Sequence, residues 1–566
     1  MQHGIRVTHS GGGSQATAAY ALGHFLPVLI LLAFAGAASA QELDREAEYR
    51  QNAAVLARYP DVPLALDTPA LKPGRVNFTT QAEMEAFLAA LKARVPALVL
   101  GSLGRSAQGR DIPYLVFTKE GLSDAAAIVA LGRPILWFIG LQHGNEPAGG
   151  EAMLALAARL ADGGLVSTLD RVTVVVVPRA NPDGAAAFTR STGSGADLNR
   201  DHILLTLPES RALHAKLIEL PPDLVVDAHE FSVANRWLQK FGAIEASDAM
   251  FLYATHPMVH PEITALADGV FRPAFEAAWK AKGLTSFWYH TTSYRPDDKL
   301  VSMGGNAPGI ARNAFGLMGV VSFLIETRGV GVGMQAFQRR VATHVLAAEA
   351  VIATAAADPR RLHETVREAR RASAAARADL IVAHRLAVEP VELPMIDPET
   401  AADRPTKVPF QDSRAVTMTA KRPRPAGYVL LGDAAAAADR LVLDMLAVCA
   451  LAAPATIEVE AFVIKGAVKR INRESINPDQ SAEVELVPKS LALPEGTRFV
   501  SMSQPAAAIA AAALEPDSPG SFIGTGIVAV PAGTNEVPIY RVDSAAVHSL
   551  RLAPLAGAPA TACEPM

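Results

Sequence analysis

The chain has 566 residues, of which 50% are hydrophobic and 19% are charged, and its formal net charge is −5. This composition predicts a globular protein of two or three domains, because a single hydrophobic core rarely grows to this size. The absence of an overall basic excess argues against a nucleic-acid-binding protein.

The N-terminal segment has the pattern of an export signal. An apolar run from Phe25 to Ala40 is short for a membrane span, and it ends in small residues that match an A-x-A cleavage site. We therefore expect a signal peptide over 1–40 with cleavage after Ala40, a secreted or periplasmic protein, and no membrane contact after cleavage. An uncleaved anchor is the alternative, because Arg6 is the only strong cation in the lead.

The next predicted elements are an N-terminal segment and the first helix and strands of an α/β domain. Residues 41–74 are a charged and then proline-rich N-terminal segment. From 75 on, helical spacing in TTQAEMEAFLAALKARV predicts a helix with a start signal at Thr79-Thr80. ALVLGSLG and DIPYLVFTKE are predicted to be short strands around a turn.

Four apolar runs then alternate with helical patterns such as EAMLALAARLAD and ESRALHAKLIEL. The runs are rich in Val, Ile and Leu, which is typical of strands buried on both faces of a sheet. This order predicts an α/β fold with a mixed, largely parallel sheet flanked by helices, over 75–345. The four runs are PILWFIG from Pro134, VTVVVVP from Val172, DLVVDAHE from Asp223 and GVVSFLIE from Gly319.

The composition and the predicted secondary structure change towards the C-terminus. A helical, Ala/Arg-rich connector is expected over 346–386, and REARRASAAARADL in it is predicted to be a solvated helix face rather than a nucleic-acid patch. The runs GYVLL, TIEVEAFVI, AEVELVP, RFVSM and GIVAV predict a separate, smaller β-rich domain over 387–566. The two cysteines, Cys449 and Cys563, can pair in an exported protein or remain free, and the sequence leaves both options open.

Polar residues follow each of the four buried strands at its C-terminal end. In open α/β sheets this edge is where ligands bind. Packing alone does not explain polar residues at four strand ends. They are His143 and Glu146, then Asn181–Gly184 and Asp197–Asp201, then Asp227, His229 and Glu230, and finally Glu326 and Arg328.

His143 and Glu146 have the spacing of a metal-binding pair. An i, i+3 separation at a strand-to-helix turn lets both side chains approach one point. Two histidines and one carboxylate form a usual catalytic zinc set that leaves a position for water, and His229 at another strand end is the candidate third ligand. Taken alone, an H-x-x-E pattern is more often a capped helix start with a solvated pair.

A metal-bound water needs a proton acceptor, and Glu326 suits this task. It lies at the end of a buried strand in SFLIETRG and is not needed as a ligand. The alternative for Glu326 is a strand-end carboxylate paired with Arg328, which is the commoner arrangement when the residue is taken alone.

HGNEP, NPDG, DLNRD, DAHE and ETRG, in this order, resemble the zinc carboxypeptidase family related to carboxypeptidase A, over 75–345. The resemblance implies one Zn²⁺ per chain, held by His143, Glu146 and His229, with Glu326 as the catalytic glutamate. It also implies a peptide or peptide-like substrate that has a free C-terminal carboxylate.

Four further residues take roles from the same resemblance. Asn199 and Arg200 match the pair that binds the terminal carboxylate, and a guanidinium fork suits that group. Arg190 matches the arginine that polarises the scissile carbonyl, and Asp197 matches the aspartate that orients the first zinc histidine. Structural ion pairing is the alternative for Asn199 and Arg200.

The chain departs from the family pattern near the substrate pocket. KLVSMGGNAPGIARNAFGL contains no tyrosine to cover a bound substrate, and the sequence does not choose between Tyr289 and Tyr294 further upstream. Arg312 could favour an acidic terminal residue, but a surface or structural arginine is the commoner case.

These residues together predict an exported zinc metallocarboxypeptidase. The first alternative keeps the metal in an amidase or deacylase that acts on N-acyl amino acids or cell-wall peptides. The second is a non-catalytic binding protein that works through its β-rich region, although intact His143, Glu146, His229 and Glu326 argue against it. The chain has no P-loop and no G-x-S-x-G motif, so phosphate binding and serine hydrolysis lack support.

Overall fold

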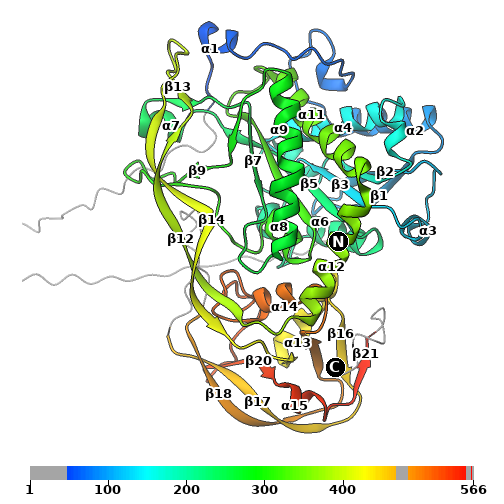
Figure 1. Cartoon of the computed structure of the whole chain (residues 1–566), viewed down its shortest axis with the longest axis vertical. Coiled ribbons are helices and arrows are strands. Elements are labelled where there is room, and N and C mark those ends of the chain that lie inside the picture. The colour runs from blue at the N-terminus through cyan, green and yellow to red at the C-terminus, as the bar shows by residue number, and fades with distance from the viewer. Residues whose placement is uncertain (1–47, 467–481, 556–562, 564–566) are drawn as a thin grey trace, which may run out of the picture. The chain divides into compact units, whose positions relative to one another are not determined.

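The computed structural model describes residues 48–466, 482–555 and 563 (Figure 1). The predicted signal peptide over 1–40 and its cleavage site lie outside these residues. The described residues belong to a single unit that starts at Glu42.

An eight-stranded sheet forms the centre of the N-terminal half. Its four middle strands are parallel, and the pairs β1–β2, β2–β4 and β11–β7 are antiparallel. The predicted mixed, largely parallel sheet is therefore confirmed. In spatial order the strands are β1 (Val99–Arg105), β2 (Asp111–Phe117), β4 (Thr173–Val177), β3 (Ile135–Gly140), β5 (Leu224–Ser232), β11 (Val321–Val330), β7 (Ala249–Tyr253) and β8 (Ser286–Trp288).

The middle strands form because their residues suit a sheet that is covered on both faces. Every residue of β3 and β4 is buried, and branched side chains such as those of TVVVV pack well on a pleated surface. The four apolar runs predicted as strands are β3, β4, β5 and β11. Their common direction brings the polar residues that follow them to one edge of the sheet.

Helices flank the sheet. α4 (Pro147–Ala161), α9 (Arg272–Ala281) and α11 (Phe337–Ala357) pack against one another beside it (Figure 1). The predicted helix near Thr80 is α2 (Gln81–Arg94), which begins with a capping box between Thr80 and Glu83. α11 has the length and composition to cross a membrane, but 72% of its most apolar window is buried, as in the core helix of a globular domain.

A four-stranded sheet connects the two halves of the chain. It has the order β12-β14-β10-β9. β12 starts at Leu380, inside the stretch predicted to be helical, and the helices before it end with α12 (Pro359–Ala375). The first residues of β12, Leu380, Ile381 and Val382, include two β-branched side chains, which suit a strand that pairs with β14. The sheet joins residues on both sides of the boundary expected at 386/387, and the domain boundaries stay predictions. The bounds are β12 (Leu380–Leu393), β14 (Thr406–Arg422), β10 (Val301–Ser302) and β9 (Thr291–Thr292).

The C-terminal region contains a seven-stranded sheet whose described pairs are antiparallel. Four of the five predicted runs are strands. The prediction for GIVAV was wrong, because Gly526, with a φ of 79°, ends a turn and 527–530 are bends and irregular backbone. The spatial order is β18 (Val484–Leu493), β17 (Ala455–Ile464), β20 (Glu536–Val542), β15 (Gly427–Leu430), β19 (Arg498–Ser501), β16 (Val448–Leu451) and β21 (Leu552–Pro554).

Two helices and one disulfide complete the C-terminal region. α13 (Gly432–Leu443) packs against α6 (Pro208–Glu219), and α14 (Ala507–Leu514) packs against α10 (Ala311–Leu317) and α12. Helices of the C-terminal region therefore contact helices that flank the central sheet. Cys449 and Cys563 form a disulfide, which answers the question that the sequence left open.

Candidate metal centre

The loop after β3 turns sharply before it presents its polar side chains. Leu141 has a left-handed backbone with a φ of 59°, and Glu146 caps the start of α4. Gly144 lies against another loop, since a Cβ placed on it would come within 1.8 Å of the carbonyl carbon of Gly184. Only glycine fits there, and this close approach fixes the loop that carries His143.

Two neighbouring parallel strands supply the residues that face this loop. β5 carries His229 and β11 carries Glu326, and the two residues are direct partners in the strand register. Residues that are paired in register project to the same face of a sheet. The fold therefore brings the predicted ligand His229 and the predicted base Glu326 to one place.

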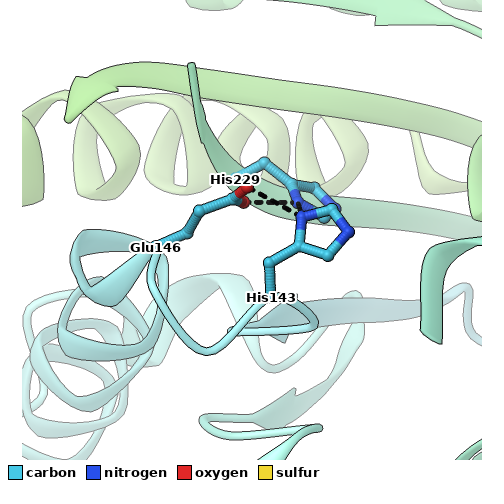
Figure 2. A group of neighbouring side chains, drawn as sticks. All are labelled: His143, Glu146 and His229. Atoms are coloured by element: carbon cyan, nitrogen blue, oxygen red, sulfur yellow. Dashed lines mark hydrogen bonds and ion pairs between the residues drawn. The ribbon is translucent and has the colours of Figure 1, made fainter. Parts of the chain in front are cut away.

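The three predicted ligands converge, as Figure 2 shows. Nδ1 of His143 lies 2.8 Å from Oε1 of Glu146, and Nδ1 of His229 lies 2.8 Å from its Oε2. The two Nδ1 atoms are 3.1 Å apart, and each of the three side chains is at most 3% exposed. One ligand atom from each residue can therefore face a shared point.

The outer nitrogens of both imidazoles face carboxylates. Nε2 of His143 lies 3.1 Å from Oδ1 of Asp197, and Nε2 of His229 lies 2.7 Å from Oδ2 of Asp227. An Nε2–H that donates to a carboxylate leaves the Nδ1 lone pair free for a metal. Two such imidazoles and one carboxylate are a donor set that fits Zn²⁺.

The charges around the cluster favour a bound cation. Burial alone would lower the pKa of His229, but Asp227 and Glu146 outweigh it and raise that pKa well above its usual range. Burial would raise the pKa of Asp197, but Arg190 and His143 hold it well below its usual range. Buried carboxylates thus surround two imidazoles, and this arrangement is stable only when cations or protons neutralise it.

Glu326 is a buried carboxyl group beside these ligands. It is 6% exposed, and burial together with the Glu146 carboxylate raises its pKa to about 8. In the described part of the chain, no ion pair joins Glu326 to Arg328. The guanidinium of Arg328 instead donates to the carbonyl of Glu245 at 2.9 Å and stacks on the ring of Tyr59.

The predicted Arg190 and Asp197 also lie at the cluster. Nη1 of Arg190 is 3.1 Å from Nδ1 of His143 and 3.4 Å from Oε1 of Glu146. Its Nε donates to Oδ2 of Asp197 at 3.0 Å. One aspartate therefore contacts both the outer nitrogen of a ligand histidine and an arginine that points at the ligand atoms.

Asn199 and Arg200 occupy different environments. Nδ2 of Asn199 lies 3.1 Å from Nε2 of His229, and its Oδ1 accepts the backbone N–H of Ala311 at 2.8 Å. Arg200 is exposed, and its Nη1 donates to the carbonyl of Asn199 at 2.7 Å. Within the described ranges, Arg200 has no carboxylate partner, so ion pairing does not account for it.

The residues that the sequence left undecided lie near Gly304. A Cβ on Gly304 would be 2.5 Å from the ring of Tyr289 and 3.5 Å from Nη2 of Arg312. Arg312 is 2% exposed and donates to the carbonyls of Gly304 and Gly305, so it is not a surface arginine. The ring of Tyr294 stacks on Arg236 at 4.6 Å.

Sequence reasoning named Asp227 as a polar strand-end residue but gave it no role. Side chains alternate along a strand, so Asp227 and His229 share one face of β5. The alternation of side chains along β5 could therefore have predicted the contact between Asp227 and His229. Glu230, one residue later, points away from His229 and binds the N–H of Ala148 and the guanidinium of Arg340.

Comparison with known proteins gives a consistent result. A family model described as zinc carboxypeptidase matches residues 84–232, which include all three candidate ligands but not Glu326. Carboxypeptidase 2 of Trichophyton rubrum is 28% identical over 477 residues, covering 82% of this chain and 86% of the relative. Carboxypeptidase 2 of Trichophyton tonsurans is 29% identical over 451 residues, covering 78% and 82%.

Solved structures are similar over about half of the chain. A metallo-carboxypeptidase from Burkholderia cenocepacia is 21% identical with a TM-score of 0.36, covering 49% of this chain and 69% of the other. A metallo-carboxypeptidase from Pseudomonas aeruginosa, solved in complex with (2-guanidinoethylmercapto)succinic acid, is 20% identical with a TM-score of 0.36 and the same coverage.

Proposed function

Because the chain belongs to the zinc carboxypeptidase family, a family of hydrolases, we propose that it removes C-terminal residues from peptides, with Glu326 as the general base. One observation carries this proposal. The Nδ1 atoms of His143 and His229 and the carboxylate of Glu146 converge, while each outer nitrogen faces its own aspartate. That arrangement suits a metal with an open position better than it suits packing.

His143, Glu146 and His229 would hold one Zn²⁺ per chain. When bound, zinc supplies a Lewis acid that polarises the carbonyl and lowers the pKa of a water molecule. Asp227 and Asp197 keep the two imidazoles in the tautomer that presents Nδ1.

Glu326 handles the protons of the reaction. A nearby cation lowers the pKa of a buried carboxyl group, so Glu326 would be ionised in the metal-loaded protein. The carboxylate takes a proton from the attacking water as the new carbon–oxygen bond forms. It then gives that proton to the nitrogen of the leaving amine as the carbon–nitrogen bond breaks.

Two arginines bind the charges of the substrate. Arg190, which already points at the ligand atoms, is placed to stabilise the negative oxygen that develops on the scissile carbonyl. Arg200 is exposed and can bind the terminal carboxylate through both ends of its guanidinium. The backbone N–H of Ala311 in α10 donates to Oδ1 of Asn199, and this contact positions the neighbouring Arg200.

Paired peptides test this function. We expect the chain to cleave a peptide with a free C-terminus and to leave the C-terminally amidated peptide intact, because the amidated one lacks the charge for Arg200. A zinc chelator should stop the cleavage, and added zinc should restore it. Equal cleavage of both peptides would support the amidase or deacylase alternative, and absence of stoichiometric zinc in the purified protein would support the binding-protein alternative.

We also propose a secreted or periplasmic location. The support is the sequence of the N-terminal segment alone. N-terminal sequencing of the protein from its native host should give Gln41 as the first residue. A chain that starts upstream of Phe25 and stays with the membrane fraction would support the uncleaved anchor.

A further inference from the structure

A second pair of histidines, His202 and His214, lies outside the metal centre. Both side chains are wholly buried, and so are Gln142 and Asp444, which lie at the two ends of the pair. Gln142 belongs to the loop after β3, His214 to α6, and Asp444 to the end of α13 in the C-terminal region. Four buried polar side chains in contact cost more free energy than apolar ones unless they are paired.

The four side chains contact one another in series. Nε2 of His202 lies 2.7 Å from Oε1 of Gln142, and its Nδ1 lies 3.1 Å from Nε2 of His214. An amide oxygen only accepts, so Nε2 of His202 carries the hydrogen, and Nδ1 accepts a hydrogen from Nε2 of His214. Each ring therefore has a fixed tautomer and a fixed orientation on this side.

Asp444 lies at the far end of the series. Its Oδ1 lies 3.1 Å from Nδ1 of His214, a contact that is an ion pair when the imidazole is protonated, and neither oxygen has a hydrogen-bond donor among the described residues. Burial raises the pKa of Asp444 to about 6. Burial and the neighbouring His214 lower the pKa of His202 well below its usual range, so His202 is neutral.

One end of the series fixes the residue before a metal ligand. The side chain of Gln142 is held by His202, and its carbonyl accepts a hydrogen bond from Nδ2 of Asn181 at 3.0 Å. With both groups of Gln142 held, the peptide that joins it to His143 has little freedom to rotate. The direction in which the imidazole of His143 leaves the chain is set at this peptide.

The other end lies in the C-terminal region. Nη1 of Arg440, also on α13, donates to the carbonyls of Leu204 and Leu205 at 2.6 Å each. Leu205 has a φ of 46°, a backbone conformation that leucine rarely adopts, so this segment is held by its contacts. α13 thus supports the segment after Arg200 at two places.

We propose that His202, His214 and Asp444 are positioning residues, through which the C-terminal region sets the orientation of Gln142 and thereby of the metal ligand His143. This inference rests on the proposed zinc site. It gives the C-terminal region a part in metal binding, whereas a purely structural role would affect folding stability alone.

The first test compares Asp444→Asn with Asp439→Asn in the whole chain. Asp439 is exposed on the same helix, so it loses the same charge without touching the series. Zinc affinity is measured by competition with a chromophoric chelator, at a temperature where circular dichroism shows each variant to be folded. We expect Asp444→Asn to weaken zinc binding about 5-fold, below the range seen for groups that touch a ligand directly, and to lower kcat with little change in KM.

A second variant keeps the inference testable if Asp444→Asn does not fold. In His214→Gln the side-chain amide can still donate to His202, but the contact with Asp444 is lost. This variant should therefore weaken zinc binding as much as Asp444→Asn does. The double variant should be no weaker than either single variant, because both break one series. Additive losses, or zinc affinity within about twofold of wild type in both single variants, would overturn the inference. A wild-type chain that binds no zinc would overturn the proposed function as well.

Discussion

Two pairs of buried histidines lie on either side of one loop, and they differ in how their rings meet. In His143 and His229 the same atom, Nδ1, faces its counterpart at 3.1 Å. In His202 and His214 an Nδ1 faces an Nε2 at 3.1 Å. Two neutral rings can form a hydrogen bond in the second arrangement. In the first, the outer nitrogens face carboxylates, and the facing Nδ1 atoms repel unless a proton or a metal cation lies between them.

The carboxylates around each pair cause this difference. His143 and His229 each have an aspartate on the outer nitrogen and share Glu146 on the inner side. The second pair has one carboxylate, at its far end. The pKa of His229 is accordingly raised by Asp227 and Glu146 despite burial, whereas burial and His214 lower that of His202. Imidazoles become candidate metal ligands here through the partners of their outer nitrogens, and proximity alone does not suffice.

The largest expected effect separates the two pairs directly. His229→Gln removes a ligand atom, so stoichiometric zinc and peptide cleavage should both be lost. His202→Gln is the matched control, since it makes the same change in the other pair and should still bind one zinc per chain when zinc is in excess. Elemental analysis after gel filtration measures both. Retention of tightly bound zinc by His229→Gln would remove this histidine from the site.

Replacing the base should leave the metal in place. Glu326→Gln keeps the size of the side chain but cannot accept the proton of water, so kcat should fall by about 10³, within the range for general-base catalysis. Zinc content should equal that of the wild type. Activity close to wild type in a variant that carries zinc would refute the role of Glu326.

The aspartates on the outer nitrogens should have graded effects. Asp227→Asn should weaken zinc binding by about 10- to 100-fold, because Asp227 is buried and lies 2.7 Å from its histidine. Asp197→Asn should weaken it less, because its contact is 3.1 Å long and its side chain is 24% exposed. Chelator competition gives the order of the two affinities, and the reverse order would contradict this account.

The smallest effect is a change in proton count. Glu326 has a pKa of about 8, above its ordinary 4.5, so it holds a proton at neutral pH until a cation lowers that pKa. In the metal-free protein, Glu326 contributes fully to folding stability below about pH 4.5. This contribution is lost as the pH rises through about 8. Zinc binding at pH 7 should release protons, and Glu326→Gln should release about one fewer.

Calorimetry in buffers of different ionisation enthalpy measures this proton release. Zinc affinity should rise with pH up to about 8, because Glu326 loses its proton over that range. The Glu326→Gln variant serves as the control for the glutamate part. An equal proton count in both proteins would show that Glu326 is already ionised before the metal binds.

The sequence was sufficient to predict the central strands and the edge at which the candidate site residues meet. Runs such as TVVVV favour buried strands, and parallel strands bring their C-terminal ends to one edge, so His143, His229 and Glu326 were expected to lie near each other. The roles of these residues stay predictions. The contact of Asp227 was accessible from alternation along β5, but no role was assigned to it.

Other features had no local pattern to reveal them. His202 and His214 are 12 residues apart, but Gln142 lies 60 residues before His202 and Asp444 lies far beyond His214, and nothing in the residues around Asp444 points to His214. In the C-terminal region, the strand β20 was missed and the irregular segment 526–530 was predicted as a strand. Strand propensity depends on cross-strand neighbours, which a short apolar run does not specify.

The four-stranded sheet β12-β14-β10-β9 has a practical consequence for shortening this protein. β10 pairs with β14 through Val301 and Phe410, and the segment before β10 carries Tyr289 and Tyr294 on either side of β9. A chain cut near residue 345, where composition suggests a boundary, would leave β10 with an unpaired edge and would uncover α10. Such a fragment is expected to aggregate, whereas one that extends through the C-terminal sheet is expected to stay in solution.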